Sequence, residues 1–503
     1  MTISVWILGD QLTVNHPALE AALHHGKQSD IRVLMIESES RVHRMHYAAK
    51  KLILLFSAMR HYAESLRLDG YELDYRIAQD MKAALKAHVE AHQPSLLIVM
   101  AASSYGGLAF QESLENILQF PVKIIPNALF LSRQYDPFPG IDKGESIRQE
   151  QFYRRMRRHF NLLMDEDGKP TGGQWNYDKK NRAPFDGEVE IPGLVSFEPD
   201  EITLEVIDEV LEKFPWTQKP EKFDLAVTHQ EAQEAADDFF EHRLKYFGTY
   251  EDAMTQADDV LFHSMLSPYL NLGLLDPLAL AQRAQAMYQD GSVSLNNAEG
   301  FIRQVIGWRE YMHWQYWRLM PDLADVNYFD VHQVLPEFFW TGETEMNCLK
   351  HALGRSLEDG YLHHIERLML ISNYCLLAGV APQAVLKWFQ SLFIDAYDWV
   401  MLPNVLGMSM YADGGMIGTK PYVASANYIN KMSDYCQGCP YDHKLRTGED
   451  ACPFNFLYWN FLLQHEELLR ENPRMARMLY NLEYLDGEER DAVKESTKIF
   501  LRL

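Results

Sequence analysis

Four of the five cysteines in this 503-residue chain are spaced in a way that suits a metal centre. Cys436 and Cys439 form a CxxC pair, Cys452 follows and directly precedes a proline, and Cys348 comes from an earlier helical region. Four thiolates complete a tetrahedral zinc site, and they also ligate a 4Fe-4S cluster. Single buried cysteines are common in cores, but a CxxC with a nearby Cys-Pro is not. The spacing therefore predicts a metal or cluster site and leaves its identity open.

The fifth cysteine, Cys375, lies inside the apolar run LMLISNYCLLAG and is interpreted as a core residue. So few cysteines do not form a disulfide framework, which indicates a reducing compartment. The start MTISVWILGDQL has neither a basic segment nor a small-residue cleavage site, and the apolar runs are too short to span a bilayer. We therefore expect a cytoplasmic protein with no membrane contact.

The segment SMLSPYLNLG, residues 264–273, has the composition of a phosphate site. Two serines, a proline and a glycine surround a predicted helix start, where backbone N–H groups and the helix dipole favour an anion. Simple helix capping explains the same residues equally well. The segment taken alone does not distinguish a phosphate site from simple helix capping.

The net charge of −24 argues against a protein that coats nucleic acid non-specifically, since phosphate binding requires local positive potential. Any DNA contact must therefore be a confined basic patch. The candidates are Arg154, Arg155, Arg157 and Arg158, followed by Lys179, Lys180 and Arg182. Composition alone favours a solvated helix face and a charged loop.

Five short apolar runs alternate with amphipathic helical patterns in the first part of the chain. They cover residues 3–8, 33–36, 73–77, 96–100 and 122–125. This alternation predicts a doubly wound parallel sheet, which binds ligands at the carboxyl ends of its strands. The loops at residues 9–11 and 37–39 would lie there. No GxGxxG follows the first run, so an ordinary dinucleotide site is not expected.

The remainder is predicted to be helical after a long connection. Between residues 127 and 215 periodicity weakens, and one basic helix is expected near 149–163. Apolar side chains then recur at helical spacing in residues 298–320, 362–378, 382–396 and 454–470. We predict an α/β N-terminal doubly wound parallel-sheet domain (1–126), a linker (127–215) and an all-α C-terminal domain (216–503).

Four motifs, in the same order and at similar spacing, resemble those of photolyases and cryptochromes. Residues 264–273 resemble the SxLSPYLxxG flavin-phosphate motif, and FIRQVIGWREY (301–311) resembles the WREF helix. DGYLHHIERLM (359–369) is similar to GWMHNRxRM, with a His-His pair as in (6-4) photolyases, and DAYDWVMLPNVLGM (395–408) resembles the loop around the isoalloxazine. Because the first domain and the linker match as well, the resemblance covers nearly the whole chain.

The resemblance implies that the helical domain binds FAD. Carried over by position, the FAD-binding residues are Ser264, Leu266, Ser267, Arg309, Trp388, Asp395, Asp398 and Asn404. The two aspartates would contact the flavin ring or ribityl region, and the asparagine would lie near N5. Trp388 would be the electron donor nearest the flavin; for Trp340 and Tyr397 core packing is the favoured reading.

The four spaced cysteines and GGQWNYDKKNR (172–182) resemble the iron-sulfur bacterial branch of this family. In that branch Cys348, Cys436, Cys439 and Cys452 would ligate a 4Fe-4S cluster, which decides between the two metal readings. The branch also uses 6,7-dimethyl-8-ribityllumazine as an antenna. Asp10 and Glu37 would hydrogen-bond its heterocycle at the strand ends.

The implied activity is light-driven repair of (6-4) photoproducts by an electron from excited reduced FAD, assisted by a general acid. His364 is the expected acid, with His363 beside it, because imidazole exchanges a proton near neutral pH. Where eukaryotic (6-4) photolyases have a further histidine, this chain has Leu368, so one histidine must suffice or Tyr422 must assist.

The implied partner is UV-damaged DNA, contacted by Lys179, Lys180 and Arg182, and the protein is expected to act as a monomer in a bacterial cytoplasm. Two other functions stay open at this point. A signalling cryptochrome would have the same cofactors, and a non-enzymatic iron-sulfur DNA-binding protein would have no flavin.

Overall fold

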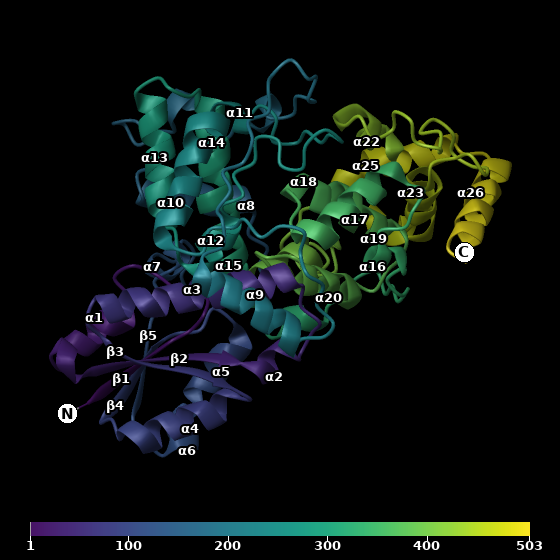
Figure 1. Ribbon diagram of the computed structural model, residues 1–503. Coiled ribbons are helices and arrows are strands. Elements are labelled where there is room, and N and C mark those ends of the chain that lie inside the picture. Colours follow the sequence, from purple (N-terminus) through teal and green to yellow (C-terminus); the bar gives the residue numbers. More distant parts are fainter. Residues whose placement is uncertain (1, 503) are drawn as a thin grey trace.

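The computed structural model describes residues 2–502, and its first part is a five-stranded parallel sheet (Figure 1). The strands are β1 (Ile3–Ile7), β2 (Ile31–Ser38), β3 (Glu72–Ala78), β4 (Leu96–Met100) and β5 (Val122–Ile125). Their order is β3-β2-β1-β4-β5. The chain therefore adds β2 and β3 on one side of β1 and then returns to add β4 and β5 on the other side. The predicted doubly wound sheet is confirmed, and each predicted apolar run is one of its strands.

Helices cover both faces of this sheet (Figure 1). α1 (Pro17–Leu23) and α3 (Ala49–Leu68) lie on one face, and α4 (Met81–His92) and α6 (Leu114–Leu118) lie on the other. Because side chains alternate along a strand, Val5 packs with the first pair of helices and Trp6 with the second. The three central strands, β1, β2 and β4, are buried on both sides, which explains their nearly continuous apolar runs, whereas the edge strands β3 and β5 are partly exposed.

The second strand is longer than its apolar run. Glu37 and Ser38 pair in parallel register with Ile77 and Ala78, so both residues belong to β2. The prediction placed Glu37 in a loop after the strand, and that placement is wrong. Apolar periodicity marks the strand only where both faces are buried by hydrophobic neighbours, whereas backbone pairing continues into the polar end.

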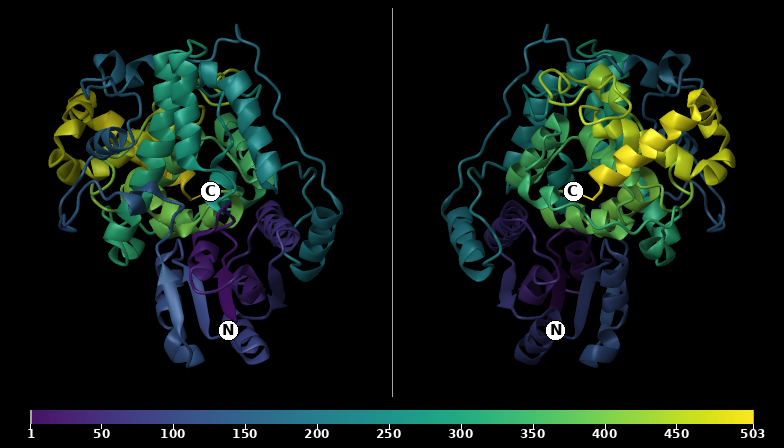
Figure 2. Two further views of the ribbon diagram at one scale, coloured as in Figure 1. Left: turned by 90° about the vertical axis from the view of Figure 1, so that its left-hand side faces the viewer. Right: turned by 90° about the vertical axis from the view of Figure 1, so that its right-hand side faces the viewer.

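The connection between the two parts contains more helix than expected. α8 (Gln149–His159) is the predicted basic helix, but a further helix, α9 (Glu201–Lys213), begins at Asp200, whose side chain accepts from the Thr203 amide. α9 packs on α3, so the connection returns over the sheet before it enters the helical part (Figures 1 and 2). The boundaries at residues 126 and 215 stay predictions.

The helical part follows the predicted segments, with irregular turns where the sequence motifs lie. The segment predicted at 298–320 consists of α14 (Leu295–Ile302), a π-helical stretch (Arg303–Arg309) and α15 (Glu310–Leu319). Three further π-helical stretches cover Phe239–Arg243, Arg367–Ser372 and Leu402–Ser409. Such stretches are frequent at functional sites because they redirect side chains.

Two other predicted helices end differently. α20 (Pro382–Leu392) stops four residues before the predicted end, because Phe393 takes an extended backbone. α23 (Pro453–Gln464) and α24 (Glu466–Arg470) match the segment predicted at 454–470, with a break at His465. The early end of α20 leaves the following residues as a turn that faces the interior.

The sheet lies below the helical part in Figure 2, and direct contacts join them. Lys51 of α3 donates to the backbone carbonyls of Gln390 and Ala396, both at 2.7 Å, and the Leu12 amide donates to Leu272 at 2.8 Å. Within residues 2–502, no helix combines the length and the apolar character needed to cross a membrane.

Candidate active site and cysteine centre

A cavity of about 1080 Å³ opens in the helical part. The predicted site residues in its walls are Ser264, Ser267, Arg309, His364, Asp395, Asn404, Tyr422 and Arg182. Of the predicted flavin, catalytic and DNA-binding residues, those that do not line it are Leu266, Trp388, Asp398, His363, Lys179 and Lys180. The volume slightly exceeds the usual range of small-molecule pockets, so it has room for a large cofactor.

Asp395 anchors one wall of the cavity. Its carboxylate accepts a bidentate pair of hydrogen bonds from Arg367, at 2.9 and 3.0 Å, and a third from the Ser267 hydroxyl at 2.7 Å. The side-chain amide of Asn271 donates to the Asp395 carbonyl at 2.8 Å. The turn after α20 is thereby fixed, and the buried charge of Asp395 is balanced by Arg367.

The serine-rich segment therefore works differently from simple capping. α12 (Ser267–Leu272) has Leu266 as its N-cap, and no side chain caps it. The Ser267 hydroxyl turns to Asp395 instead, and the Ser264 hydroxyl accepts weakly from the Leu266 amide at 3.4 Å. Ser264 and Ser267 both face the cavity, while Leu266 is buried behind them.

Arg309 supplies a buried cation to the cavity wall. It pairs with Glu310, and its guanidinium lies 4.7 Å from the Phe130 ring centroid and 5.3 Å from that of Trp399. Burial lowers the pKa of Arg309, and its Nε has no hydrogen-bond partner among the described residues. A desolvated guanidinium with a free N–H suits an anionic ligand group.

Asn404 is the second polar group that projects from the motif at 395–408. It belongs to the π-helical stretch Leu402–Ser409 and lines the cavity. Its side-chain N–H donates to the Val400 carbonyl at 2.8 Å, which leaves the amide oxygen free to accept. An amide held in this way can orient one polar edge of a ligand.

Besides Leu266, two predicted flavin contacts lie outside the cavity. Asp398 accepts from Gln390 at 2.8 Å, and burial raises its pKa. Trp388 is completely buried, donates to the Phe339 carbonyl at 3.0 Å and packs on Phe389 with ring centroids 5.1 Å apart. Because Phe389 lines the cavity, it separates Trp388 from the interior space.

The adjacent histidines face different surroundings. His364 is exposed to the cavity, whereas His363 is 2% exposed and contacts Glu366 at 3.5 Å. Desolvation by the surrounding cavity walls, together with the cations Arg367 and Arg303, lowers the pKa of His364 to about 4. His364 is therefore neutral at pH 7 in the free protein, which differs from the expected titration near neutrality.

Tyr422 lies in the same wall, and burial raises the pKa of its hydroxyl, so it is a protonated donor at neutral pH. The positive charges nearest to it are Arg474 and Arg182. Lys420 and Lys431 also line the cavity. Together Arg182, Lys420, Lys431 and Arg474 form a basic rim.

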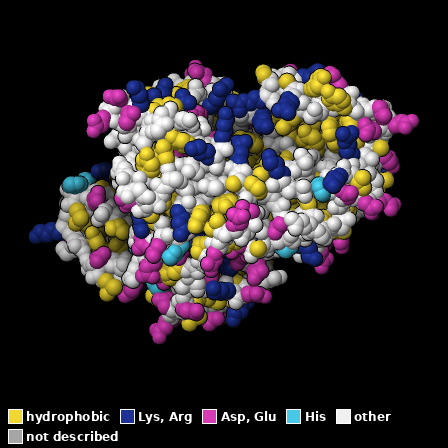
Figure 3. Space-filling model, turned by 90° about the horizontal axis from the view of Figure 1, so that it is seen from above, with side chains coloured by type: hydrophobic (Ala, Val, Ile, Leu, Met, Phe, Trp, Pro, Cys, Tyr) yellow, Lys and Arg dark blue, Asp and Glu magenta, His cyan; other side chains and the backbone are white. Residues whose placement is uncertain are grey.

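Only Arg182 of this basic rim was predicted. Lys420, Lys431 and Arg474 are isolated in the sequence and meet only through the fold, so no local pattern indicated them. Lys and Arg side chains gather in the upper middle of the face shown in Figure 3, the side on which α22 (Ala426–Met432) lies at the top of Figure 1.

The other predicted basic residues are arranged less favourably for DNA. Lys179 and Lys180 are exposed but do not line the cavity. In α8, Arg157 is fully buried and donates to three backbone carbonyls, and Arg154 pairs with Glu150 at 2.8 Å. The candidate patch on α8 is therefore largely structural.

The structure brings the four spaced cysteines together. Cys348, Cys436, Cys439 and Cys452 line one small apolar cavity, and Cys375 lies elsewhere in the core. All are free thiols. Burial raises the pKa of Cys436 to about 11 and that of Cys452 to about 12; burial, and after it the neighbouring cysteines, also raise the pKa of Cys348.

This thiol geometry fits a bound metal or cluster. Four thiolates that line one cavity, two of them buried and two half-buried, are unfavourable unless a cationic centre compensates them. The cavity walls add Met346, Ala426, Ile429, Tyr435, Tyr441 and His443 and contain no acidic side chain, so the cysteines are the dominant donor set.

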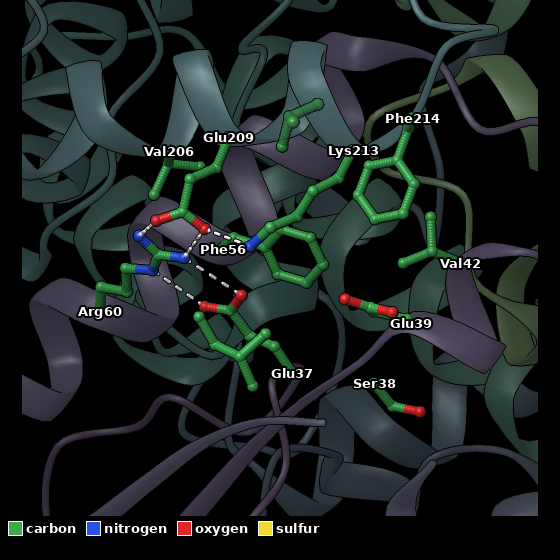
Figure 4. Close-up of a pocket in the computed structure, with 12 residues that line it drawn as sticks. Glu37, Ser38, Glu39, Val42, Phe56, Arg60, Val206, Glu209, Lys213 and Phe214 are labelled. Carbon is green, nitrogen blue, oxygen red and sulfur yellow. Dashed lines mark hydrogen bonds and ion pairs between the residues drawn. The ribbon is translucent and has the colours of Figure 1, made fainter. Parts of the chain in front are cut away.

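Glu37 lies in a different environment, shown in Figure 4. Arg60 donates to both of its oxygens, at 2.9 and 3.2 Å, and the Tyr75 hydroxyl donates at 2.5 Å. Arg60 also pairs with Glu209 of α9, which Lys213 contacts at 2.7 Å. The hollow beside this network measures only about 20 Å³, so side chains must move before a heterocycle fits there.

Asp10 does not line the hollow at Glu37. It lies after β1, near Ser103 and Asp398, and burial raises its pKa. Both acids are at the carboxyl ends of neighbouring strands, as predicted, but the structure does not bring them into one pocket.

Comparisons with known proteins agree with this architecture. Residues 5–222 match the family model for deoxyribodipyrimidine photo-lyase-related protein. A (6-4) photolyase from Agrobacterium fabrum is 42% identical over 510 aligned positions, which cover 100% of this chain and 99% of the relative.

Two solved structures share the fold. A bacterial class III photolyase from Agrobacterium tumefaciens aligns with a TM-score of 0.57 at 18% identity, over 98% of this chain and 91% of that one. A cryptochrome from Synechocystis aligns with a TM-score of 0.59 at 17% identity, over 81% and 82%. Together with the full-length relative, these matches show that the chain belongs to the photolyase and cryptochrome family of flavoproteins.

Proposed function

We propose that this protein repairs (6-4) photoproducts in UV-damaged DNA with the energy of light. The observation that carries the proposal is His364, which faces a large cavity whose other walls hold the flavin-motif residues Asp395 and Asn404. The full-length relative described as a (6-4) photolyase supports the same activity. A lesion turned out of the DNA stack would enter from the side of the basic rim.

FAD fits the cavity by volume and by chemistry. Arg309 offers a desolvated cation with a free N–H, and the Asn404 amide offers a free oxygen. Asp395, held by Arg367 and Ser267, offers a fixed acceptor. A bound reduced flavin supplies the electron when light excites it. The protein residues exclude water, orient the two ligands and manage the proton.

His364 handles the proton in this proposal. Its imidazole is neutral in the free protein because the protein walls, Arg367 and Arg303 disfavour a further positive charge. Phosphates of bound DNA bring negative charge to the cavity mouth and raise the pKa of His364 toward neutrality. Protonation is thereby coupled to substrate binding, and Tyr422 donates a neutral hydrogen bond nearby.

The cysteine centre is proposed to hold a 4Fe-4S cluster that joins the segments carrying Cys348, Cys436 and Cys452. Support comes from the resemblance to the iron-sulfur branch and from the all-cysteine cavity. The lumazine antenna is proposed at the strand ends near Glu37, where it requires rearrangement of the Arg60 network. Monomeric state and cytoplasmic location stay predictions.

The activity is tested by illuminating the reduced protein with two separate oligonucleotides. One carries a cyclobutane dimer and the other a (6-4) photoproduct, and chromatography measures each repaired product. Repair of the (6-4) DNA supports the proposal. Repair of cyclobutane dimers alone contradicts the substrate, and repair of neither indicates a signalling role.

A further inference from the structure

His263 is a second histidine at the reaction-site wall, beside His364, and the mechanism above does not use it. It directly precedes Ser264, in a loop where Leu261 and Met265 have φ angles of 51° and 52°. Left-handed backbone at branched or long residues is unfavourable and persists only where surrounding structure holds it. The loop is therefore fixed in a conformation that presents His263 to the cavity.

The ring of His263 is in contact with both members of the His-His pair. It stacks on His363 with centroids 4.4 Å apart and planes at 9°, and it meets His364 edge-on at 5.4 Å and 76°. His263 and His364 line the cavity, whereas His363 lies behind them. Leu368 also lines the cavity and has no titratable group. The wall thus presents two imidazoles from separate segments.

One nitrogen of His263 lacks a partner. The side chain is 6% exposed, and its Nε2 is buried without a hydrogen bond to any residue within 2–502. Phe247 packs against the ring with centroids 5.8 Å apart, so an apolar neighbour covers part of it. Buried polar atoms are rarely left unsatisfied, and one beside a cavity indicates that a ligand or water completes it.

We propose that His263 is a second reaction-site imidazole, which shares one proton with His364 during repair. The inference rests on the proposed (6-4) activity. The reaction moves a hydroxyl or amino group from one base to the other, and it consumes no net proton or electron. A proton passes from the imidazole pair to the migrating group as its bond to the first base breaks, and it returns once the second bond has formed.

The charges around the pair allow at most one shared proton. Arg303 and Arg367 face His364 from the cavity walls, and Arg355 faces His363 from behind. Glu366 is the acid that contacts His363, and Arg355 already pairs with it at 3.0 Å. Burial and the neighbouring His364 lower the pKa of His263. Because one imidazolium disfavours a second, the two rings titrate as a coupled unit.

Two substitutions separate the nitrogen of His263 from its packing. His263→Phe keeps an aromatic ring against His363 and removes both nitrogens, and His263→Gln returns a polar end of similar reach. We expect His263→Phe to lower the quantum yield of (6-4) repair at least tenfold at pH 7, with FAD content and damaged-DNA affinity unchanged. His263→Gln should recover part of the loss.

The pH profile and a titration complete the test. The pH profile of repair should change from a coupled to a single ionisation in His263→Phe. In the resting protein, ¹⁵N NMR should show a higher pKa for His263 in His364→Ala, because the neighbouring charge is removed. Wild-type yield and profile in His263→Phe, or an unchanged His263 pKa in His364→Ala, would overturn the inference. Absence of (6-4) repair by the wild type would instead contradict the proposed function.

Discussion

The helical cavity and the Glu37 hollow are both built from buried polar groups, but only the cavity leaves such groups unpaired. In the cavity, Arg309 and His263 each keep a nitrogen without a partner among the described residues. At Glu37, Arg60 and Tyr75 occupy the carboxylate, and Glu209 completes the network. Unpaired buried groups beside a large space indicate a ligand site, whereas a closed network is stable without one.

The largest expected effect is the loss of a cysteine from the metal centre, compared with the loss of a cysteine from the ordinary core. Cys452→Ser should remove iron and acid-labile sulfide and destabilise the helical part, since cluster ligation contributes on the order of 10 kcal/mol to folding. Cys375→Ala, outside the centre, should retain the iron and cost about 1 kcal/mol. Elemental analysis and chemical denaturation measure both. Stoichiometric zinc without iron in the wild type would contradict the cluster.

Asp395 and Asp398 allow the cavity boundary to be tested with a matched pair. Asp395→Asn leaves Arg367 buried without its charge partner, and we expect FAD affinity to fall about 100-fold, equivalent to about 3 kcal/mol. Asp398→Asn lies outside the cavity walls and should change FAD affinity less than tenfold. Flavin release followed by fluorescence compares the two variants; equal losses would mean that the cavity does not define the flavin site.

Substitutions in the network at Glu37 test whether that region binds a ligand as the helical cavity does. Glu37→Ala should remove supplied lumazine while FAD stays bound, and it should cost about 1–3 kcal/mol because Arg60 and Tyr75 lose an acceptor. Glu209→Ala is the control, since it leaves the Glu37 contacts intact. Mass analysis of extracted chromophores decides the first point. Wild-type protein that holds only FAD when lumazine is supplied would leave Glu37 with a purely structural role.

The smallest expected effect concerns the basic residues. Replacing Lys420 and Lys431 with alanine should flatten the salt dependence of DNA binding by about two units of slope, because each phosphate contact contributes about 0.9. The matched pair of alanines at Lys179 and Lys180, outside the cavity, should flatten it less. Binding titrations at several salt concentrations measure both, and a reversed order would place the DNA on the loop rather than on the basic rim.

Local sequence patterns predicted those structural features that are determined by residues close together in the sequence. All five strands follow predicted apolar runs, and the three central strands are buried on both faces. The CxxC with its Cys-Pro indicated three of the four clustered thiols directly. The motif at 395–408 located Asp395, although not its separation from Asp398. Each of these features is encoded within about fifteen residues, where periodicity and spacing are readable.

Features that depend on tertiary contacts were missed. Lys420, Lys431 and Arg474 form the basic rim only because distant segments meet at the cavity. In the sequence, His263 is a single histidine beside the serine motif, and no local pattern distinguishes it from a core histidine. Its contact with His364 exists only in the folded loop. The lowered pKa of His364 likewise arises from desolvation by the surrounding cavity walls and from Arg367 and Arg303, the second of which is 61 positions away in the sequence.

The central claim is that His364 supplies the proton for (6-4) repair within this cavity. The most direct measurement is the (6-4) repair rate of His364→Ala under light, together with FAD content, photoreduction and damaged-DNA affinity. We expect repair to fall by about 10⁴ or more, at the upper end of general acid catalysis, while the other three quantities stay nearly unchanged. Repair of (6-4) DNA by His364→Ala at the wild-type rate would contradict it.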